Sequence, residues 1–225
     1  MSLFIAIEGI DGSGKGTQAA RLHAYLMSKG QRSALLSFPR YQQTMFGQKV
    51  GDFLNGRFGT LESVHPLLVS LLFAGDRFES RELIQTAMAN YDVVICDRYV
   101  ASNVAHQGAK ASGTDRTELI DWIQHLEYSI YQLPRADLTL FLDVDVEHAQ
   151  ELIAAKSRRD YTEKAADLQE ADANYLRRVR EVYLELASGA QWKSIHCVHG
   201  SHVRTIDEIA AEIAAVVDAS LQRSP

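Results

Sequence analysis

The residues best suited to chemistry lie within the first twenty positions of the chain. An apolar run typical of a buried strand, residues 3–8, leads into a glycine-rich segment, and a helical pattern follows. This order matches the G-x-x-x-x-G-K motif, in which backbone N–H groups surround phosphate oxygens and a lysine reaches the terminal phosphates. The start of the helix adds the positive end of its dipole. We therefore predict a nucleotide-phosphate site formed by Gly9, Asp11, Gly12, Ser13, Gly14, Lys15, Gly16 and Thr17.

The end of this motif has an unusual order of residues. Gly16 separates Lys15 from the hydroxyl of Thr17, whereas the common pattern has Ser or Thr directly after the lysine. The Lys-Gly-Thr ending also occurs in nucleoside monophosphate kinases, so it favours that subclass. The alternative is a glycine-rich turn that binds no ligand. We favour the phosphate site because strand, loop, lysine and helix follow one another in the required order.

A second candidate segment is Asp97-Arg98, which closes the apolar run Val-Val-Ile-Cys. An aspartate that ends a buried strand beside a phosphate loop can hold Mg²⁺ directly or through water. We predict Mg²⁺ as the cofactor, with ATP as phosphoryl donor and with Thr17 and Asp97 as metal ligands. Arg98 can grip a second phosphate through two N–H groups. The alternative is a simple salt bridge between Asp97 and Arg98.

The elements that must position these residues alternate between strand and helix. Strands are predicted over residues 3–8, 33–38, 92–97, 138–143 and 194–198. Helices are predicted over residues 14–28, 44–54, 67–90, 117–132, 146–155, 164–187 and 205–221. This alternation predicts one α/β domain over residues 1–225, a P-loop NTPase-type three-layer sandwich with a five-stranded parallel sheet. Ligands are then expected beyond the carboxyl ends of the strands.

The composition narrows the classes of partner. The 225 residues include 29 acidic and 23 basic ones, for a net charge of −6, and no basic run is present. We therefore expect no binding to a nucleic acid polymer. Cys96 and Cys197 lie in strand-like runs without a metal-ligand spacing, which favours reduced thiols in a cytoplasmic protein. The early strand leaves no room for a signal peptide, and no apolar stretch is long enough to cross a membrane.

The most polar segment of the second half covers residues 156–164 and contains Arg158 and Arg159. It lies between two predicted helices, so we interpret it as a short lid that closes over bound nucleotides. The alternative is a solvated charged loop, which is the usual role of such a run.

Five segments, in order, resemble the thymidylate kinase family over nearly the whole chain. They cover residues 8–15, 38–40, 72–77, 97–103 and 183–187. The resemblance implies transfer of the ATP γ-phosphoryl group to dTMP, which gives dTDP and ADP in dTTP biosynthesis, by a homodimer. The alternatives are a kinase for another nucleotide or a deoxynucleoside, and a P-loop switch without turnover.

The resemblance also implies roles for single residues. Phe73 would stack on the pyrimidine, Arg77 would donate to a base carbonyl, and Asn103 would read the base edge. Because an arginine only donates, Arg77 suits the O4 acceptor of thymine and disfavours the amino group of cytosine. Asp11 would contact the sugar 3′-hydroxyl or the metal. The implied substrate site comprises Asp11, Phe38, Arg40, Phe73, Arg77, Arg98, Ser102, Asn103 and His106, and the implied catalytic residues are Lys15, Asp97, Arg98, Arg158 and Arg159.

Two positions depart from the family pattern. His106 stands where Tyr or Phe is expected against the deoxyribose 2′ position, which predicts weaker exclusion of ribonucleotides. Gly12 stands where some members carry an arginine, and in the family the loss of that arginine goes with basic residues in the lid. Arg158 and Arg159 are suitably placed to supply that charge.

Overall fold

The computed structural model describes residues 2–154, 168–169 and 172–222. Its centre is a five-stranded parallel sheet with the strand order β2-β3-β1-β4-β5. The strands are β1 (Leu3–Glu8), β2 (Ser33–Ser37), β3 (Val93–Asp97), β4 (Leu138–Asp143) and β5 (Trp192–His196). The predicted sheet is confirmed. The last strand lies two residues earlier than the predicted range of 194–198.

The register of the sheet brings the two chemical segments together. β1 is the central strand, and its Ile7 pairs with Asp97 of β3 and with Leu140 of β4. The carboxyl ends of these parallel strands therefore lie at one edge of the sheet. The loop after β1 and the residues after β3 start from this same edge, as the sequence predicts.

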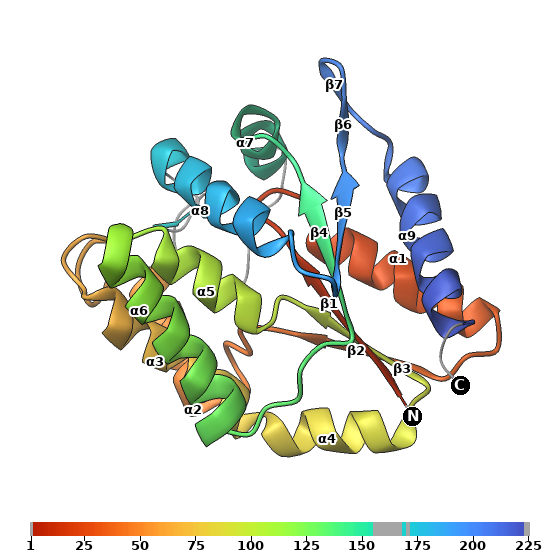
Figure 1. The fold of residues 1–225 in the computed structure, drawn as a ribbon, viewed down its shortest axis with the longest axis horizontal. Helices are drawn as coiled ribbons and strands as arrows, with labels where there is room; N and C mark the ends of the chain where they lie inside the picture. Colours follow the sequence, from red (N-terminus) through yellow and green to blue (C-terminus); the bar gives the residue numbers. More distant parts are fainter. Residues whose placement is uncertain (1, 155–167, 170–171, 223–225) are drawn as a thin grey trace.

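Helices cover both faces of the sheet (Figure 1). One face carries α1 (Lys15–Ser28) and α9 (Ile206–Leu221), and the other carries α4 (Arg81–Asn90), α5 (Val100–Gly108) and α6 (Gly113–Gln124). Alternate side chains of β1 point to opposite faces. Ile5 and Ile7 pack in the cluster with α1 and α9, whereas Phe4 and Ala6 pack with α4, α5 and α6.

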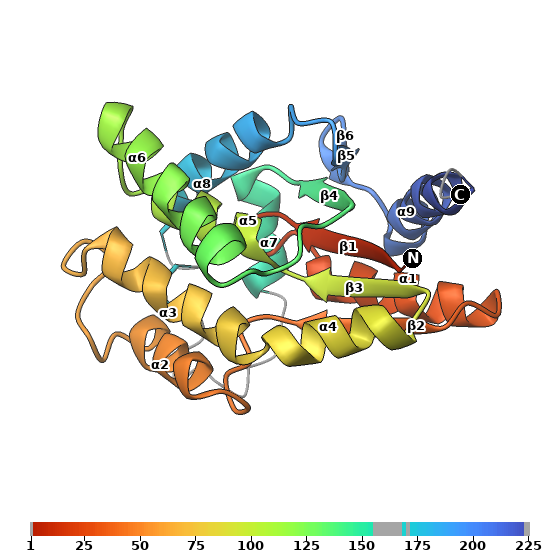
Figure 2. The same cartoon turned by 60° about the horizontal axis from the view of Figure 1, so that its bottom comes forward.

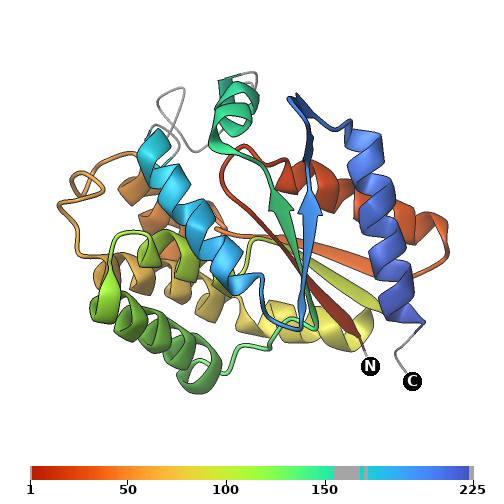
Figure 3. The same cartoon turned by 45° about the horizontal axis from the view of Figure 1, so that its top comes forward.

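The remaining elements lie around the carboxyl edge of the sheet or at its side. They are α2 (Met45–Leu54), α3 (Pro66–Glu79), the π-helix η1 (His125–Ile130), α7 (Val146–Ala154), α8 (Ala173–Leu186) and the short hairpin of β6 (Val198–His199) and β7 (His202–Val203). Figure 3 shows the segment between β1 and α1 passing beside α7. In the part of the chain that the structure describes, no helix is both long and apolar enough to cross a membrane.

The predicted helix over residues 67–90 is in fact two helices. α3 ends at Glu79, Ser80 adopts φ −94° and ψ 3°, and α4 begins at Arg81 and continues from the end of α3 (Figure 2). The buried Ser80 hydroxyl donates to the carbonyl of Asp76 at 2.8 Å, four residues back. Such back-bonding by serine bends helices, and the apolar pattern alone does not reveal it.

Three further boundaries differ from the predictions. Residues 100–108 form α5, which the sequence analysis did not predict as a helix. The predicted helix 117–132 begins earlier, at Gly113, and changes to π-helical hydrogen bonding after Gln124. The predicted helix 164–187 is observed as α8 from Ala173, and part of its predicted first half lies outside the described residues. α9 begins with a capping box, in which the Thr205 side chain and Glu208 satisfy each other's backbone N–H groups.

Candidate active site

The loop between β1 and α1 holds its lysine against its own backbone. Lys15 Nζ donates to the Ile10 carbonyl at 2.7 Å and to Ser13 Oγ at 3.3 Å. The side chain is only 6% exposed. Burial, together with the nearby charge of Arg98, lowers the pKa of Lys15 to about 7. The ammonium therefore lies in a protected position at the start of α1, where the helix dipole also favours an anion.

Gly12 of the loop and Gly16 of the first turn of α1 approach neighbouring groups closely. Gly12 has φ +84°, and a Cβ there would meet the Ala149 carbonyl oxygen of α7 at 2.3 Å. No side chain fits at this position, so an arginine of the kind some family members carry would require the loop to move. A Cβ at Gly16 would lie 3.0 Å from Asp97 Oδ2. The glycine after Lys15 thus lets α1 begin beside the Asp97 carboxylate.

The short distance between the start of α1 and the Asp97 carboxylate bears on the predicted Mg²⁺ site. Among the described residues, no group of three or more His, Cys, Asp or Glu side chains could hold a metal ion. Nucleotide-bound Mg²⁺ needs only one or two protein ligands, since phosphates and waters supply the rest. Asp97 beside the first turn of α1, with the exposed Thr17 on that turn, fits this requirement. Asp11 instead forms an ion pair with Arg98.

Arg98 follows β3 directly and adopts a left-handed backbone conformation, with φ +66°. Its guanidinium pairs with Asp11 and donates to Ser102 Oγ at 3.3 Å. Burial by itself lowers the pKa of Arg98, but the neighbouring carboxylate of Asp11 outweighs it and raises the pKa. A non-glycine residue in this conformation costs about 1–3 kcal/mol and is most often found at functional sites. Here it turns the arginine over the carboxyl edge of the sheet.

Next to the loop lies a cavity, which we call the central pocket, with about 470 Å³ of empty space that is partly open to solvent. Eight predicted substrate residues line it: Asp11, Phe38, Phe73, Arg77, Arg98, Ser102, Asn103 and His106. Five further lining residues were not predicted: Pro39, Tyr41, Leu54, Gln107 and Gln169.

Arg40 is the predicted substrate residue that the structure does not bring into the lining of the central pocket. Its Nε donates to Gln43 Oε1 at 2.8 Å, and its Nη1 donates to Ser80 Oγ at 3.1 Å. Its backbone N–H donates to Asp76 Oδ2 at 3.0 Å. The guanidinium therefore faces the junction of α3 and α4 in this conformation.

The end of the central pocket farthest along α3 contains a buried ion pair. Arg77, 1% exposed, donates from Nε and Nη2 to the two carboxylate oxygens of Glu127, at 2.5 and 2.6 Å. Asn103 Nδ2 donates to Glu127 Oε1 at 2.9 Å and to the Ser70 carbonyl at 3.0 Å. Arg77 and Asn103 thus share one acceptor, which holds them side by side.

Several buried polar atoms that face this region have no hydrogen-bond partner among the described residues. They are Asn103 Oδ1, His106 Nε2, and both side-chain polar atoms of Gln107. Buried polar groups are almost always satisfied, so such atoms in a pocket are available to hydrogen-bond a ligand or ordered water. Gln107 was not predicted from the sequence, although its i+4 spacing from Asn103 places it on the same helix face.

His106 is a buried neutral ring. Its Nδ1 lies 3.0 Å from the Tyr175 hydroxyl, and its Nε2 lies 3.9 Å from Asp11 Oδ2. Burial lowers the pKa of His106 to about 3, despite the opposing effect of Asp11. The ring therefore carries no charge at neutral pH and presents a compact polar edge to the central pocket.

Glu8, the last residue of β1, joins the loop strand to two helices. Its carboxylate accepts from the backbone N–H groups of Tyr99 and Ser102 at 2.8 and 3.2 Å, and from the Tyr183 hydroxyl at 2.9 Å. Ser102 Oγ also donates to it at 2.6 Å. Burial raises the pKa of Glu8 in spite of these bonds. Glu8 therefore caps α5, the helix that carries Asn103, and fixes it relative to β1.

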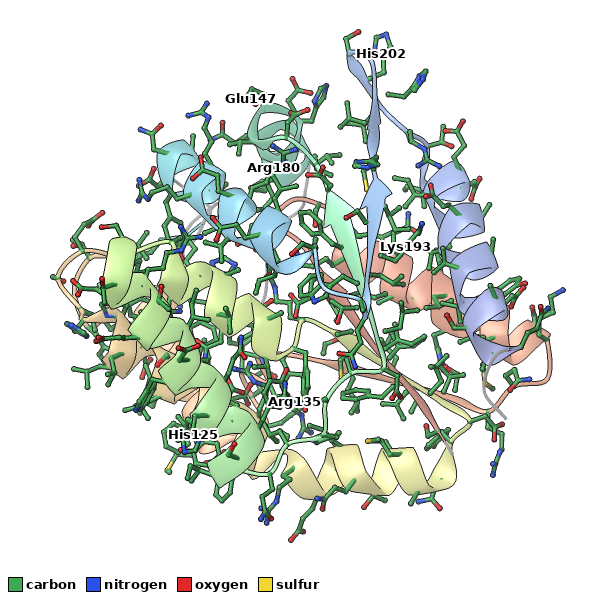
Figure 4. The ribbon with its side chains drawn as sticks, in the orientation of Figure 1. His125, Arg135, Glu147, Arg180, Lys193 and His202 are labelled. Atoms are coloured by element: carbon green, nitrogen blue, oxygen red, sulfur yellow. The ribbon has the colours of Figure 1, made fainter. Side chains whose placement is uncertain are left out.

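A further charged contact lies at the carboxyl edge of the sheet. Arg180 of α8 donates from Nε to Asp143 Oδ1, at the end of β4, at 2.7 Å (Figure 4). Figure 4 also labels Glu147 of α7, which accepts from Arg177 at 2.7 Å. These residues were not predicted from the sequence. The predicted catalytic arginines Arg158 and Arg159 lie outside the described residues.

Comparisons with known proteins agree with this geometry. The family model for thymidylate kinase matches residues 7–209. A thymidylate kinase of Mycobacterium tuberculosis is 37% identical over 193 residues, which cover 84% of this chain and 89% of the relative. A probable thymidylate kinase of Thermococcus gammatolerans is 33% identical over 223 residues, or 97% of each chain.

The fold matches as well as the sequence. The solved structure of a thymidylate kinase from Candida albicans superposes with a TM-score of 0.73 at 27% identity, and the match covers 97% of this chain and 92% of that one. The residues that the family model matches include the loop after β1 and every residue that lines the central pocket. The chain belongs to the thymidylate kinase family.

Proposed function

We propose that the central pocket binds dTMP and that the loop after β1 presents ATP to it. As a member of its family, the chain is an ATP-dependent nucleoside monophosphate kinase that phosphorylates dTMP. The observation that carries the choice of base is the pair formed by Arg77, a donor, and Asn103 Oδ1, an unsatisfied acceptor. A switch without turnover would have no need of such a second pocket.

Base recognition follows from the hydrogen-bonding pattern of thymine. Its O4 accepts and its N3–H donates, so Arg77 can donate to O4 while Asn103 Oδ1 accepts from N3–H. Cytosine presents an amino donor and an N3 acceptor at the same positions, and would leave both protein groups unpaired. Phe73 lines the same pocket and offers its ring as a stacking surface.

The acceptor's phosphate would lie at the other end of the central pocket, toward Arg98. This arginine is held by Asp11 and Ser102, and it faces the carboxyl edge of the sheet. Arg40 would have to leave Gln43 and Ser80 to take part, and we keep it as a second phosphate contact. Asp11 then serves to orient Arg98 and to meet the sugar 3′-hydroxyl.

The donor end uses the loop and Lys15. The loop N–H groups and Lys15 would bind the phosphates of ATP, and Lys15 would exchange its bond to Ile10 for a phosphate oxygen. Thr17 and Asp97 are the residues that would hold Mg²⁺, which supplies charge neutralisation when it is bound. The attacking group is a phosphate oxygen that is already anionic, so no strong general base is required. Catalysis then rests on positioning and on charge stabilisation.

Arg158 and Arg159 complete the proposal as lid arginines. Gly12 offers no side chain to balance charge on the transferring phosphoryl group, and an arginine supplied from elsewhere contributes a factor on the order of 10³ or more in rate. The double variant Arg158→Ala/Arg159→Ala should lower kcat far more than it raises KM for either substrate. Turnover near the wild-type rate would show that these two arginines belong to a solvated charged loop and take no part in catalysis.

We also propose a cytoplasmic homodimer. Both cysteines are buried and free, which fits a reducing compartment. Exposed apolar side chains at Leu68 and Phe78 of α3 and at Ile130 of η1 offer surface for a second copy. Light scattering on the purified chain would show about twice the monomer mass if the proposal is right, and the monomer mass if it is wrong.

The experiment that tests the reaction is ³¹P NMR of the purified chain with ATP, Mg²⁺ and dTMP. The expected result is the appearance of dTDP and ADP in equal amounts. The Lys15→Ala variant is the negative control, because it removes the donor contact and leaves the central pocket intact. Release of inorganic phosphate without dTDP would show an ATPase instead.

A further inference from the structure

Glu127 is a buried carboxylate at the base end of the central pocket, although it does not line that pocket. Glu127 is the only buried residue of η1. Its more apolar neighbours Leu126, Tyr128 and Ile130 are more exposed. Turns with π-helical hydrogen bonding often mark functional sites. A charge placed inward in such a turn needs a reason, and its partners supply one.

The first partner is the amide of Asn103. Its Nδ2 lies between two acceptors, the Ser70 carbonyl at 3.0 Å and Glu127 Oε1 at 2.9 Å. Turning the amide over would place Oδ1 against both acceptors and lose two hydrogen bonds. The amide is therefore fixed with Nδ2 inward, and the unpartnered Oδ1 remains for the ligand.

The second partner is the guanidinium of Arg77. Glu127 occupies Nε and Nη2, which fixes the plane of the group and leaves Nη1 for a ligand. Burial alone lowers the pKa of Arg77, but the ion pair outweighs it and raises the pKa, so the arginine stays charged. Because Glu127 balances that charge, the base end does not compete with Arg98 for the acceptor's phosphate.

We propose that Glu127 is a positioning residue that sets the base specificity of the kinase. It holds Asn103 with its oxygen toward the ligand and Arg77 with one donor toward the ligand. This presents one acceptor beside one donor, the complement of a 4-oxo pyrimidine with a protonated N3. The inference rests on the proposed function and adds a residue that contacts no substrate itself.

The test is the Glu127→Gln variant, assayed with dTMP and with dCMP at saturating ATP and Mg²⁺. Glutamine keeps the size of the side chain but replaces one acceptor oxygen with a donor, so Arg77 and Asn103 can no longer both be satisfied. We expect the ratio of kcat/KM for dTMP to that for dCMP to fall by roughly tenfold or more. The loss should appear mainly in KM for dTMP, with KM for ATP unchanged.

Two further variants separate positioning from stability. Glu185→Gln is the matched control, because Glu185 pairs with Arg116 on the exposed surface at 2.7 Å, and it should leave the ratio unchanged. Glu127→Asp keeps the charge that pairs with Arg77, so it covers the case in which Glu127→Gln does not fold. Its shorter side chain cannot reach both partners, and we expect the ratio to fall by roughly threefold or more.

The outcomes distinguish this inference from the proposed function. If the wild-type chain does not prefer dTMP among pyrimidine monophosphates, the proposed function fails. If the wild-type chain prefers dTMP but the folded Glu127 variants keep the wild-type ratio, the inference on Glu127 is wrong. The inference would also be wrong if the variants lost activity equally with dTMP and with dCMP and their kinetic parameters for ATP changed to the same extent. That result would indicate a structural role only.

Discussion

At the phosphate end of the active site, Lys15 and its partners Ile10 and Ser13 lie no more than five positions apart in the chain. At the base end, Arg77 and Glu127 lie fifty positions apart, and they meet Asn103 from a third element. The first end is a local motif whose backbone does much of the binding. The second is a side-chain network that exists only after α3, α5 and η1 have packed. The two ends should therefore respond differently to substitution.

The largest expected effect is at Lys15. Lys15→Ala should keep the fold, since the glycines set the loop, and should lower kcat by a factor on the order of 10³ or more, because transition-state charge loses its partner. Steady-state ADP release measures this, and dTMP binding by calorimetry should be unchanged. Lys29→Ala, at the exposed end of α1, is the control. Activity within tenfold of the wild type would remove Lys15 from the phosphate site.

The next effect is at Arg77. Arg77→Ala removes the donor to the base and leaves the buried Glu127 carboxylate without its positive partner, so both base choice and stability should decrease. We expect the preference for dTMP over dCMP to fall roughly ten- to a hundredfold, and the free energy of unfolding to drop by about 3 kcal/mol. Kinetics with both nucleotides and urea denaturation measure the two parts.

The control for Arg77→Ala is Arg81→Ala. Arg81 donates to the Tyr131 carbonyl at 3.2 Å and does not line the central pocket. If Arg77→Ala weakened only ATP binding, Arg77 would belong to the donor end.

A smaller effect is expected at His106. His106→Tyr should sharpen the preference for the deoxy sugar by roughly threefold to tenfold, because a larger ring fills space that a 2′-hydroxyl could occupy. The ratio of rates with dTMP and its ribonucleotide analogue measures this. His125→Tyr, on the exposed surface of η1, is the control (Figure 4). An unchanged ratio would show that His106 does not face the sugar.

The smallest effect on activity is expected at Lys110, outside both ends. Its Nζ is buried without a hydrogen-bond partner among the described residues and lies 5.2 Å from the centre of the Phe53 ring. Burial lowers the pKa of Lys110 from 10.5 to about 8. Between these values the unfolded chain binds a proton that the folded protein lacks, so the stability contributed by this group rises with pH.

Lys110→Met should therefore raise the free energy of unfolding by about 1–3 kcal/mol at pH 7, and the gain should shrink as the pH rises above 8. Denaturation of both proteins at pH 7 and pH 9.5 measures the difference, and kcat should be unchanged. A gain that is the same at both pH values would contradict the assigned pKa.

The same comparison explains what the sequence could predict. The loop with Lys15 could be predicted because its residues are neighbours in the chain. Asp97 could be predicted because it ends a strand, and the strand pattern places it with the loop at the carboxyl edge of the sheet. Phe73, Arg77 and Asn103 entered through the family resemblance, and each does line the central pocket.

Glu127 could not be found in this way. It lies in a segment predicted as part of a plain helix, and only the π-helical turn and the packing of α3 against it turn the carboxylate inward. The break at Ser80 was missed for a related reason, since its hydroxyl bonds to the carbonyl of Asp76 inside an apolar pattern that continues past it. Arg40 also entered through the family resemblance, yet its guanidinium contacts Gln43 and Ser80 instead of lining the central pocket.

A panel of acceptors with the wild-type chain tests whether the central pocket selects a base with an O4 acceptor and an N3–H donor. The value of kcat/KM would be determined for dTMP, dUMP, dCMP, dAMP and dGMP at saturating ATP and Mg²⁺. We expect high values for dTMP and dUMP, because both carry the O4 acceptor and the N3–H donor, and a value for dCMP that is lower by roughly tenfold or more. A chain that used dCMP or a purine nucleotide as well as dTMP would contradict this selection.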